Sequence, residues 1–88
     1  MDILLTYKGE KYIIETKVNF QDDVKWIIEE GVRQLSVKYL AAEGTDEGYL
    51  VVFDAKTPAG AVREPQSCQA GNKQVTIIII AIGKPVLS

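Results

Sequence analysis

Two short apolar runs separated by a polar turn open the chain. The first run covers residues 3–7 and the second covers residues 12–18, and the turn between them contains Gly9. Runs of this length, rich in β-branched and aromatic residues, predict a β-hairpin. In the second run Glu15 and Lys17 stand two positions apart, so they share one face of the strand at a spacing of about 7 Å.

A helix is predicted over residues 23–42. Apolar residues recur there at spacings of three and four, a helical period, at Val24, Ile27, Ile28, Val32, Leu35 and Tyr39. Asp22 or Asp23 can cap the first free amides of this helix, and Gly44 suits a left-handed cap at its end. Gly31 falls on the apolar face, where a missing side chain allows close packing on a sheet.

The second half of the chain predicts two further strands. Residues 48–54 are nearly all apolar, which is typical of a strand covered on both faces. Residues 56–73 show no period and predict a long loop. Residues 74–82 form the last strand, whose isoleucine run would promote aggregation unless it is buried. The order β-β-α-β-loop-β predicts an α/β fold close to the α+β boundary, with a mixed sheet and a helix that joins parallel strands.

Length and composition fit one globular domain. The chain has 88 residues, of which 47% are hydrophobic and 25% are charged, as in ordinary folded domains. The net charge of −2 and the pI near 5.0 argue against a strongly basic nucleic-acid module. This net charge is compatible with a nuclease, because a small positive patch beside an acidic metal site can occur in an acidic domain.

Several chemistries are excluded by residues that the chain lacks. It has no histidine, so it has no Ser-His or Cys-His nucleophile, no histidine base and few routes to catalytic zinc. Hydrolysis would have to use carboxylates, lysine and a hard metal ion. The single cysteine, Cys68, cannot form an intrachain disulfide and fits a cytoplasmic location. The apolar run at residues 75–82 is too short to cross a membrane, and we expect neither a signal peptide nor a membrane partner.

A family resemblance rests first on four residues of the predicted hairpin. They are Asp2, near the start of the first strand, and Glu15-Thr16-Lys17, near the end of the second. Together with residues 9–14, 34–35, 39–40, 47–54 and 73–77, they resemble the PD-(D/E)XK nuclease superfamily. More narrowly, they resemble the nuclease-like domain found C-terminal to predicted AAA-ATPase domains in bacteria. A Glu-x-Lys sequence alone occurs in many proteins, whereas this combination covers nearly the whole chain and is more specific.

Two features depart from the family pattern. Met1 stands where the name-giving proline would be, and the first core helix of the superfamily is absent. The resemblance therefore implies a restriction-endonuclease-like core lacking that helix, in a single nuclease-like domain over residues 1–88 that would be a truncated one. The second departure is that Gln34 and Tyr39 are five residues apart, where four are expected.

The resemblance also implies a catalytic site. Asp2, Glu15 and the backbone carbonyl of Thr16 would bind Mg²⁺ or Mn²⁺, which prefer oxygen ligands. Lys17 would orient the attacking water or stabilise the transition state, and Gln34 would contact the water or the phosphate. We expect Arg33 and Lys38 to bind phosphates of DNA or RNA.

Plainer interpretations stand beside each of these roles. Glu15 and Lys17 can be an ion pair on an exposed sheet edge, and Asp2 can be frayed. Gln34, Arg33, Lys38 and the pair at 29–30 fit a solvated helix face, and Cys68 fits a residue without a role.

Three functional hypotheses follow. The first is a Mg²⁺-dependent hydrolase that cleaves nucleic acid. The second is an inactive nuclease-fold domain with an accessory or interaction role. Under both the first and the second hypothesis, the domain would be part of a larger AAA-ATPase-like protein. The third is a structural domain that forms homo-oligomers to cover an apolar sheet face.

Overall fold

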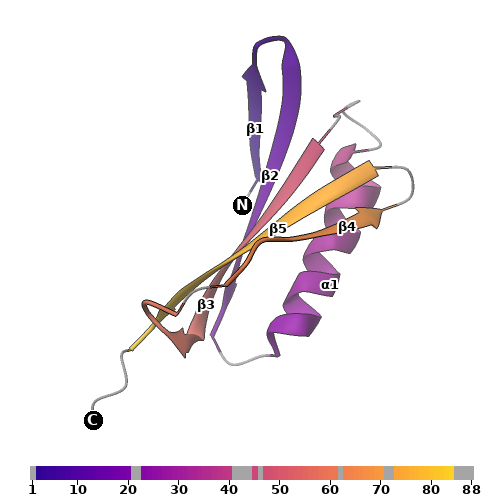
Figure 1. The fold of residues 1–88 in the computed structure, drawn as a ribbon. Coiled ribbons are helices and arrows are strands. Elements are labelled where there is room, and N and C mark those ends of the chain that lie inside the picture. The colour runs from indigo at the N-terminus through magenta and orange to yellow at the C-terminus, as the bar shows by residue number, and fades with distance from the viewer. Residues whose placement is uncertain are drawn as a thin grey trace.

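A single mixed sheet with one helix beside it makes up the fold (Figure 1). The computed structural model describes residues 2–20, 23–40, 45, 47–61, 63–70 and 73–84, and the side chains of 2–5, 38–40 and 70 lie outside that description. Its elements are β1 (Asp2–Tyr7), β2 (Glu10–Asn19), α1 (Val24–Gln34), the π-helical segment η1 (Leu35–Leu40), β3 (Glu47–Pro58), β4 (Gln66–Ala70) and β5 (Lys73–Gly83). The predicted α/β class with a mixed sheet is confirmed.

The strands lie in the order β1-β2-β3-β5-β4. β1 and β2 form the predicted antiparallel hairpin, whose turn has positive φ angles at Lys8 (52°) and Gly9 (80°). Such angles match the twist of a two-residue hairpin turn. β2, β3 and β5 run parallel, and β4 pairs antiparallel with β5 at the far edge. As predicted, the helical segment connects two parallel strands, β2 and β3.

The predicted helix over residues 23–42 is divided in two. Asp23 is the N-cap, and its carboxylate accepts a hydrogen bond of 2.9 Å from Lys25 N. The α-helical geometry ends at Gln34 and continues as one π-helical segment to Leu40. Residues 41–44, including the predicted cap Gly44, lie outside the described residues. Neither helical segment has the length and hydropathy needed to cross a lipid bilayer.

The predicted loop over residues 56–73 is wrong at its two ends, which are strand, whereas the described residues between Pro58 and Gln66 form no helix or strand. β3 continues to Pro58, and residues 66–70 form β4 along β5, with Cys68 opposite Val75. The sequence Gln-Ser-Cys-Gln-Ala has no apolar alternation that would reveal a strand. It pairs with β5, the next strand in the chain, with Ala70 opposite Lys73. The local sequence signal for this pairing is the Gly71-Asn72 pair between the two strands.

The core lies between α1 and one face of β2, β3 and β5. Alternate positions on these strands point to the helix and are buried against it, namely Ile13, Leu50, Val52, Val75, Ile77 and Ile79, with Ile27 and Leu35 from the helical segments. Gly31 packs directly on the sheet, where a Cβ atom would lie 2.6 Å from Leu50 Cδ1. The predicted close approach at this glycine is confirmed.

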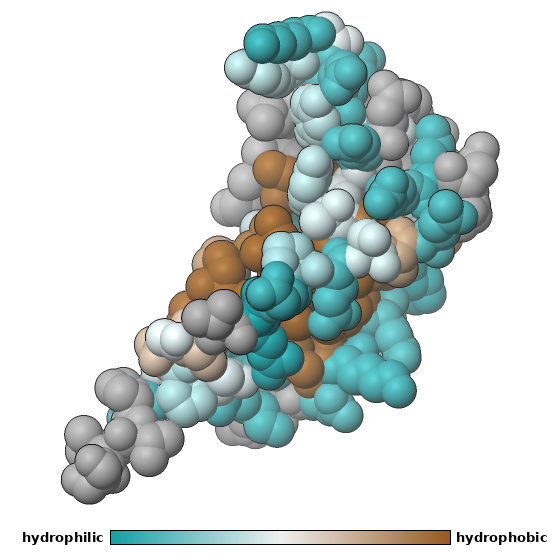
Figure 2. Space-filling model, viewed as in Figure 1, coloured by the Kyte–Doolittle hydropathy of each residue, from teal (hydrophilic) through white to brown (hydrophobic). Residues whose placement is uncertain are grey.

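The opposite face of the sheet is not covered by α1 (Figure 1). The prediction that residues 48–54 are covered on both faces is therefore wrong for the described chain, since Tyr49, Val51 and Phe53 are only half-buried. Val18, Ile80 and Ile82 are 46%, 41% and 47% exposed. In Figure 2, brown residues gather along the side of the sheet that faces away from α1. We call this surface the open face; its positions are Ile14, Thr16, Val18, Tyr49, Val51, Phe53, Thr76, Ile78, Ile80 and Ile82.

Candidate functional site

Glu15 and Lys17 lie on the face of β2 that α1 covers. The strand alternates, so both point to the same side as the buried Ile13. Glu15 is 4% exposed, and Lys17 Nζ lies 3.8 Å from Glu15 Oε1. The pair is therefore not the exposed edge pair of the plainer interpretation, because β2 lies between β1 and β3. A carboxylate is costly to bury unless a cation or hydrogen bonds compensate its charge.

The hairpin register places Asp2 opposite Glu15. Directly opposed positions in an antiparallel pair share one face, with Cβ atoms about 4.5–5.5 Å apart. The backbone therefore brings the two predicted acidic positions together, while the side chain of Asp2 lies outside the described residues. Thr16 is half-buried on the open face, so its backbone is the part of it that lies beside Glu15 and Lys17.

Gln34 lies on α1 and is held by a second glutamate. Its Nε2 donates a hydrogen bond of 3.2 Å to Glu30 Oε1, which also accepts one of 2.6 Å from Arg33 Nη2. The hydrogen bond from Arg33 is the main reason that the pKa of Glu30 lies below its ordinary value, and the positive charge of Lys17 contributes to it. The structure thus places Glu30 on the helix near Lys17 on the strand.

Glu30 is a site residue that the sequence analysis missed. It was grouped with Glu29 as part of a solvated helix face, and Glu29 is indeed exposed, whereas Glu30 is half-buried. The signal that could have found it is its spacing of four residues from Gln34, which places both on one side of a helix.

The two predicted phosphate-binding residues have different outcomes. The side chain of Arg33 is 64% exposed while it remains paired with Glu30, so its guanidinium can reach a ligand from solvent. The side chain of Lys38 lies outside the described residues. Arg33 is therefore the only one of the two whose side chain the structure places, at the solvent side of the Glu30 and Gln34 pair.

The donor set that the resemblance implies fits a hard divalent cation. It consists of two carboxylates and a backbone carbonyl, all oxygen donors, which suit Mg²⁺ or Mn²⁺. Glu15 is the one carboxylate of this set that the structure describes, and a buried carboxylate is stabilised by a cation beside it. Among the described side chains, no group of three acidic or cysteine residues converges closely enough to hold a metal ion.

A second polar cluster, which the sequence analysis also missed, lies where β2 and β3 end. We call it the strand-end cluster; it contains Asn19, Asp54, Thr57 and Arg63 and lines a cavity of about 400 Å³ beside the start of α1. Asp54 is 2% exposed and accepts hydrogen bonds from Asn19 Nδ2 (3.1 Å), Lys56 N (3.1 Å) and Thr57 Oγ1 (2.7 Å). Arg63 Nη2 lies 3.7 Å from Asp54 Oδ2. The cluster ties the end of β3 to β2 and to the segment before β4.

The charge of Asp54 makes the fold sensitive to acid. Burial by itself raises the pKa of this carboxyl group, but hydrogen bonds from Thr57, Lys56 and Asn19, together with the charge of Arg63, outweigh it and lower the pKa. The ionised Asp54 carboxylate therefore stabilises the fold fully above the pKa that an aspartate has in the unfolded chain, about 3.9. This stabilisation is lost as the pH falls through the lower pKa of Asp54 in the folded protein.

We expect the free energy of unfolding to decrease when the pH is lowered below about 4. Urea denaturation at a series of pH values measures this decrease, and Asp54→Asn should show a smaller one over the same interval. An equal decrease in both proteins would mean that other carboxyl groups cause it.

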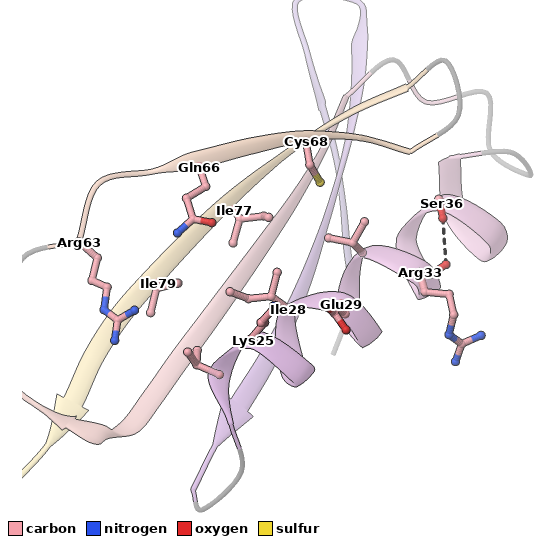
Figure 3. A pocket seen from close by; sticks show the side chains of 12 residues that line it. Lys25, Ile28, Glu29, Arg33, Ser36, Arg63, Gln66, Cys68, Ile77 and Ile79 are labelled. Carbon is pink, nitrogen blue, oxygen red and sulfur yellow. Dashed lines mark hydrogen bonds between the residues drawn. The ribbon is translucent and has the colours of Figure 1, made fainter.

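A groove separates α1 from β4 and β5 (Figure 3). It has a volume of about 710 Å³ and an apolar floor, formed by Val24, Ile28, Val32, Ile77 and Ile79. Cys68 points into it from β4, and Arg63 and Gln66 stand at its rim. The groove arises because α1 covers β2 and β3 and leaves the β4 side of the same face uncovered. It lies on the flank of α1 that carries Val24, Ile28 and Val32, not the flank with Glu30 and Gln34 near Lys17.

No protein-family model, no curated protein sequence and no solved structure matches this chain.

Proposed function

We propose that this chain is a Mg²⁺- or Mn²⁺-dependent nuclease of the PD-(D/E)XK type, which hydrolyses phosphodiester bonds in DNA or RNA. One observation carries the proposal. Glu15 and Lys17 lie together under α1, and the hairpin register sets the position of Asp2 opposite Glu15. Two acidic positions and an ammonium group on one face are the groups that the resemblance implies for metal-assisted phosphodiester hydrolysis.

Each residue has a distinct role in this proposal. Asp2, Glu15 and the Thr16 carbonyl would hold a divalent cation, which supplies activation of water and neutralises charge on the scissile phosphate. The Lys17 ammonium acts as a point charge that orients the attacking water or offsets negative charge in the transition state. Gln34, oriented by its hydrogen bond to Glu30, contacts the water or the phosphate. Arg33, largely exposed, attracts the nucleic-acid backbone.

Two features of the fold support the same proposal. The order β1-β2-α1-β3, with a hairpin followed by a helical connection between parallel strands, agrees with the strands and second helix of a restriction-endonuclease-like core. The π-helical segment η1 offers an explanation for the unexpected five-residue spacing of Gln34 and Tyr39. Since a π turn connects residues five apart, it sets these two positions one turn apart.

The second candidate is a non-catalytic nuclease-fold domain within a larger AAA-ATPase-like protein. The burial of Glu15 favours it, because a carboxylate that is 4% exposed and already close to Lys17 is less accessible to a metal ion and substrate. In this case the Glu15 and Lys17 pair would stabilise the contact between β2 and α1.

Cleavage assays separate the two candidates. The purified chain should cleave plasmid or single-stranded nucleic acid with Mg²⁺ or Mn²⁺. Lys17→Met and Glu15→Gln remove the charges with little change in shape, and each should lower the rate about 100-fold to 1,000-fold, as the loss of a transition-state contact does.

Matched controls guard against contaminating nucleases and misfolding. Lys11→Met removes an exposed ammonium from the same strand, and Glu29→Gln removes an exposed carboxylate next to Glu30, so both should keep the parent rate. Cleavage that persists unchanged in Lys17→Met would contradict the proposed site. No cleavage by the parent chain with either metal ion would favour the non-catalytic candidate.

A further inference from the structure

The open face has no charged residue among its ten positions. Seven of these positions are aliphatic or phenylalanine side chains, and the remaining three are Thr16, Tyr49 and Thr76. Three of the apolar side chains, on β2 and β5, are more than 40% exposed. A contiguous apolar surface of this kind on a folded domain marks a contact surface for another protein. It does not suit nucleic acid, whose binding requires positive charge.

The two ends of the open face carry opposite charges. At the start of β3, Glu47 accepts a hydrogen bond of 3.1 Å from Tyr49, and Glu10 accepts one from Tyr12. The rings of these two tyrosines lie 6.3 Å apart, so the glutamates stand at one end of the face. At the other end Lys84 follows β5 directly and continues the alternation of Ile80 and Ile82. Glu47 is level with Gln74 in the register, so about 33 Å of strand separates it from Lys84.

We infer that the open face is the contact surface between two copies of this chain, packed face to face with their strands antiparallel. A two-fold axis near Ile78 and Ile80 brings each Glu47 to the end of the partner's face that carries Lys84. The centre of the face, free of charge, meets its own copy without repulsion, as a two-fold interface requires. The inference does not depend on the nuclease proposal, because Glu15 and Lys17 lie on the other side of each sheet and remain outside the contact.

The size of the face sets the expected strength of the dimer. Strands about 4.8 Å apart and a two-residue repeat of about 6.7 Å give each position roughly 32 Å² of sheet plane, and ten positions give on the order of 300 Å² per copy. Side chains that project from the sheet plane increase this area. The total for two copies still stays below roughly 1,200 Å², the smallest area that stable complexes bury. The dimer should therefore be a weak one that dissociates on dilution.

Sedimentation equilibrium of the 88-residue chain, from low to high micromolar concentration, tests the inference. The parent chain should change from monomer to dimer across this range. Ile80→Glu places a charge at the centre of the face and should abolish the dimer throughout. Ile80 is 41% exposed, so the variant should fold, which circular dichroism checks. The matched control is Val37→Glu on η1, which changes a 67% exposed valine away from the face and should keep the dimer.

A charge exchange tests the antiparallel arrangement separately. Lys84→Glu and Glu47→Lys should each weaken the dimer about threefold to tenfold, as exposed ion pairs do when both symmetric copies are lost. The double variant, which restores opposite charges, should recover the parent dissociation constant. A parent chain that stays monomeric, or an Ile80→Glu variant that dimerises as strongly as the parent, would overturn the inference. A double variant no stronger than the single ones would overturn the arrangement.

Discussion

Replacing Asp54 with alanine should lower the free energy of unfolding by about 3–5 kcal/mol, as the loss of one partner from a buried charged network does. The carboxylate is 2% exposed, and its removal leaves the Nδ2 group of Asn19, the amide of Lys56 and the hydroxyl of Thr57 without their acceptor. Asn19 is itself 1% exposed, and its Oδ1 has no hydrogen-bond partner among the described residues. Urea denaturation followed by circular dichroism measures the change.

Two further variants show whether the network causes this loss. Thr57→Val removes one hydrogen bond to the carboxylate and should cost less, about 1.5–3 kcal/mol. Lys56→Met changes only an exposed side chain, since the hydrogen bond to Asp54 comes from the Lys56 backbone, and should leave stability unchanged. An Asp54→Ala variant as stable as the parent would show that the strand ends fray in solution and that the cluster does not hold them.

Replacing Leu50 with alanine should also destabilise the fold, by about 3–5 kcal/mol. Leu50 is fully buried near the start of β3 and lies directly under Gly31 of α1. Among the described residues only α1 and η1 cover this side of the sheet, so few other side chains can move into the cavity. Thermal and urea unfolding measure the loss, and Val37→Ala on the exposed side of η1 is the matched control.

Gly31 provides the second half of this test. In the parent chain Gly31→Ala places a Cβ atom 2.6 Å from Leu50 Cδ1, and overpacking of this kind costs about 1–3 kcal/mol. In the Leu50→Ala background the same change fills part of the cavity and gains helix propensity of up to about 1 kcal/mol. The two changes should therefore offset each other in a double-mutant cycle. Additive losses would show that Gly31 and Leu50 do not contact each other in solution.

Local patterns in the sequence predict the parts of this fold that depend on neighbouring residues. The turn at Gly9, the alternation along β2 and the helical spacing after Asp23 all follow from backbone periods and capping. β4 pairs with the next strand, β5, and is hard to predict because its own residues have no apolar period. The open face, in contrast, depends on cover from distant parts of the chain. A nearly all-apolar segment such as residues 48–54 predicts two covered faces, but no second described helix is present to provide the second cover.

The candidate site shows the same division. Glu15 and Lys17 could be found because they stand two residues apart on one strand. The spacing of Glu30 from Gln34 places both on one side of the helix, but the position of Glu30 near Lys17 depends on the packing of α1 over β2, which the sequence does not give. Asn19 and Asp54 are 35 residues apart and meet only because β2 and β3 are parallel neighbours. Single polar residues at strand ends give no pattern that predicts such a pairing.

The π-helical segment η1 has a consequence for changes in chain length. A π turn contains one residue more per turn than the α-helix it extends, so it accommodates an insertion without rotating the rest of the helix. Deletion of one residue near Val37 would restore α-helical spacing there and leave the contact of Gly31 with Leu50 in place. Homologous chains can therefore differ in length by one residue at this point while the sheet keeps its register.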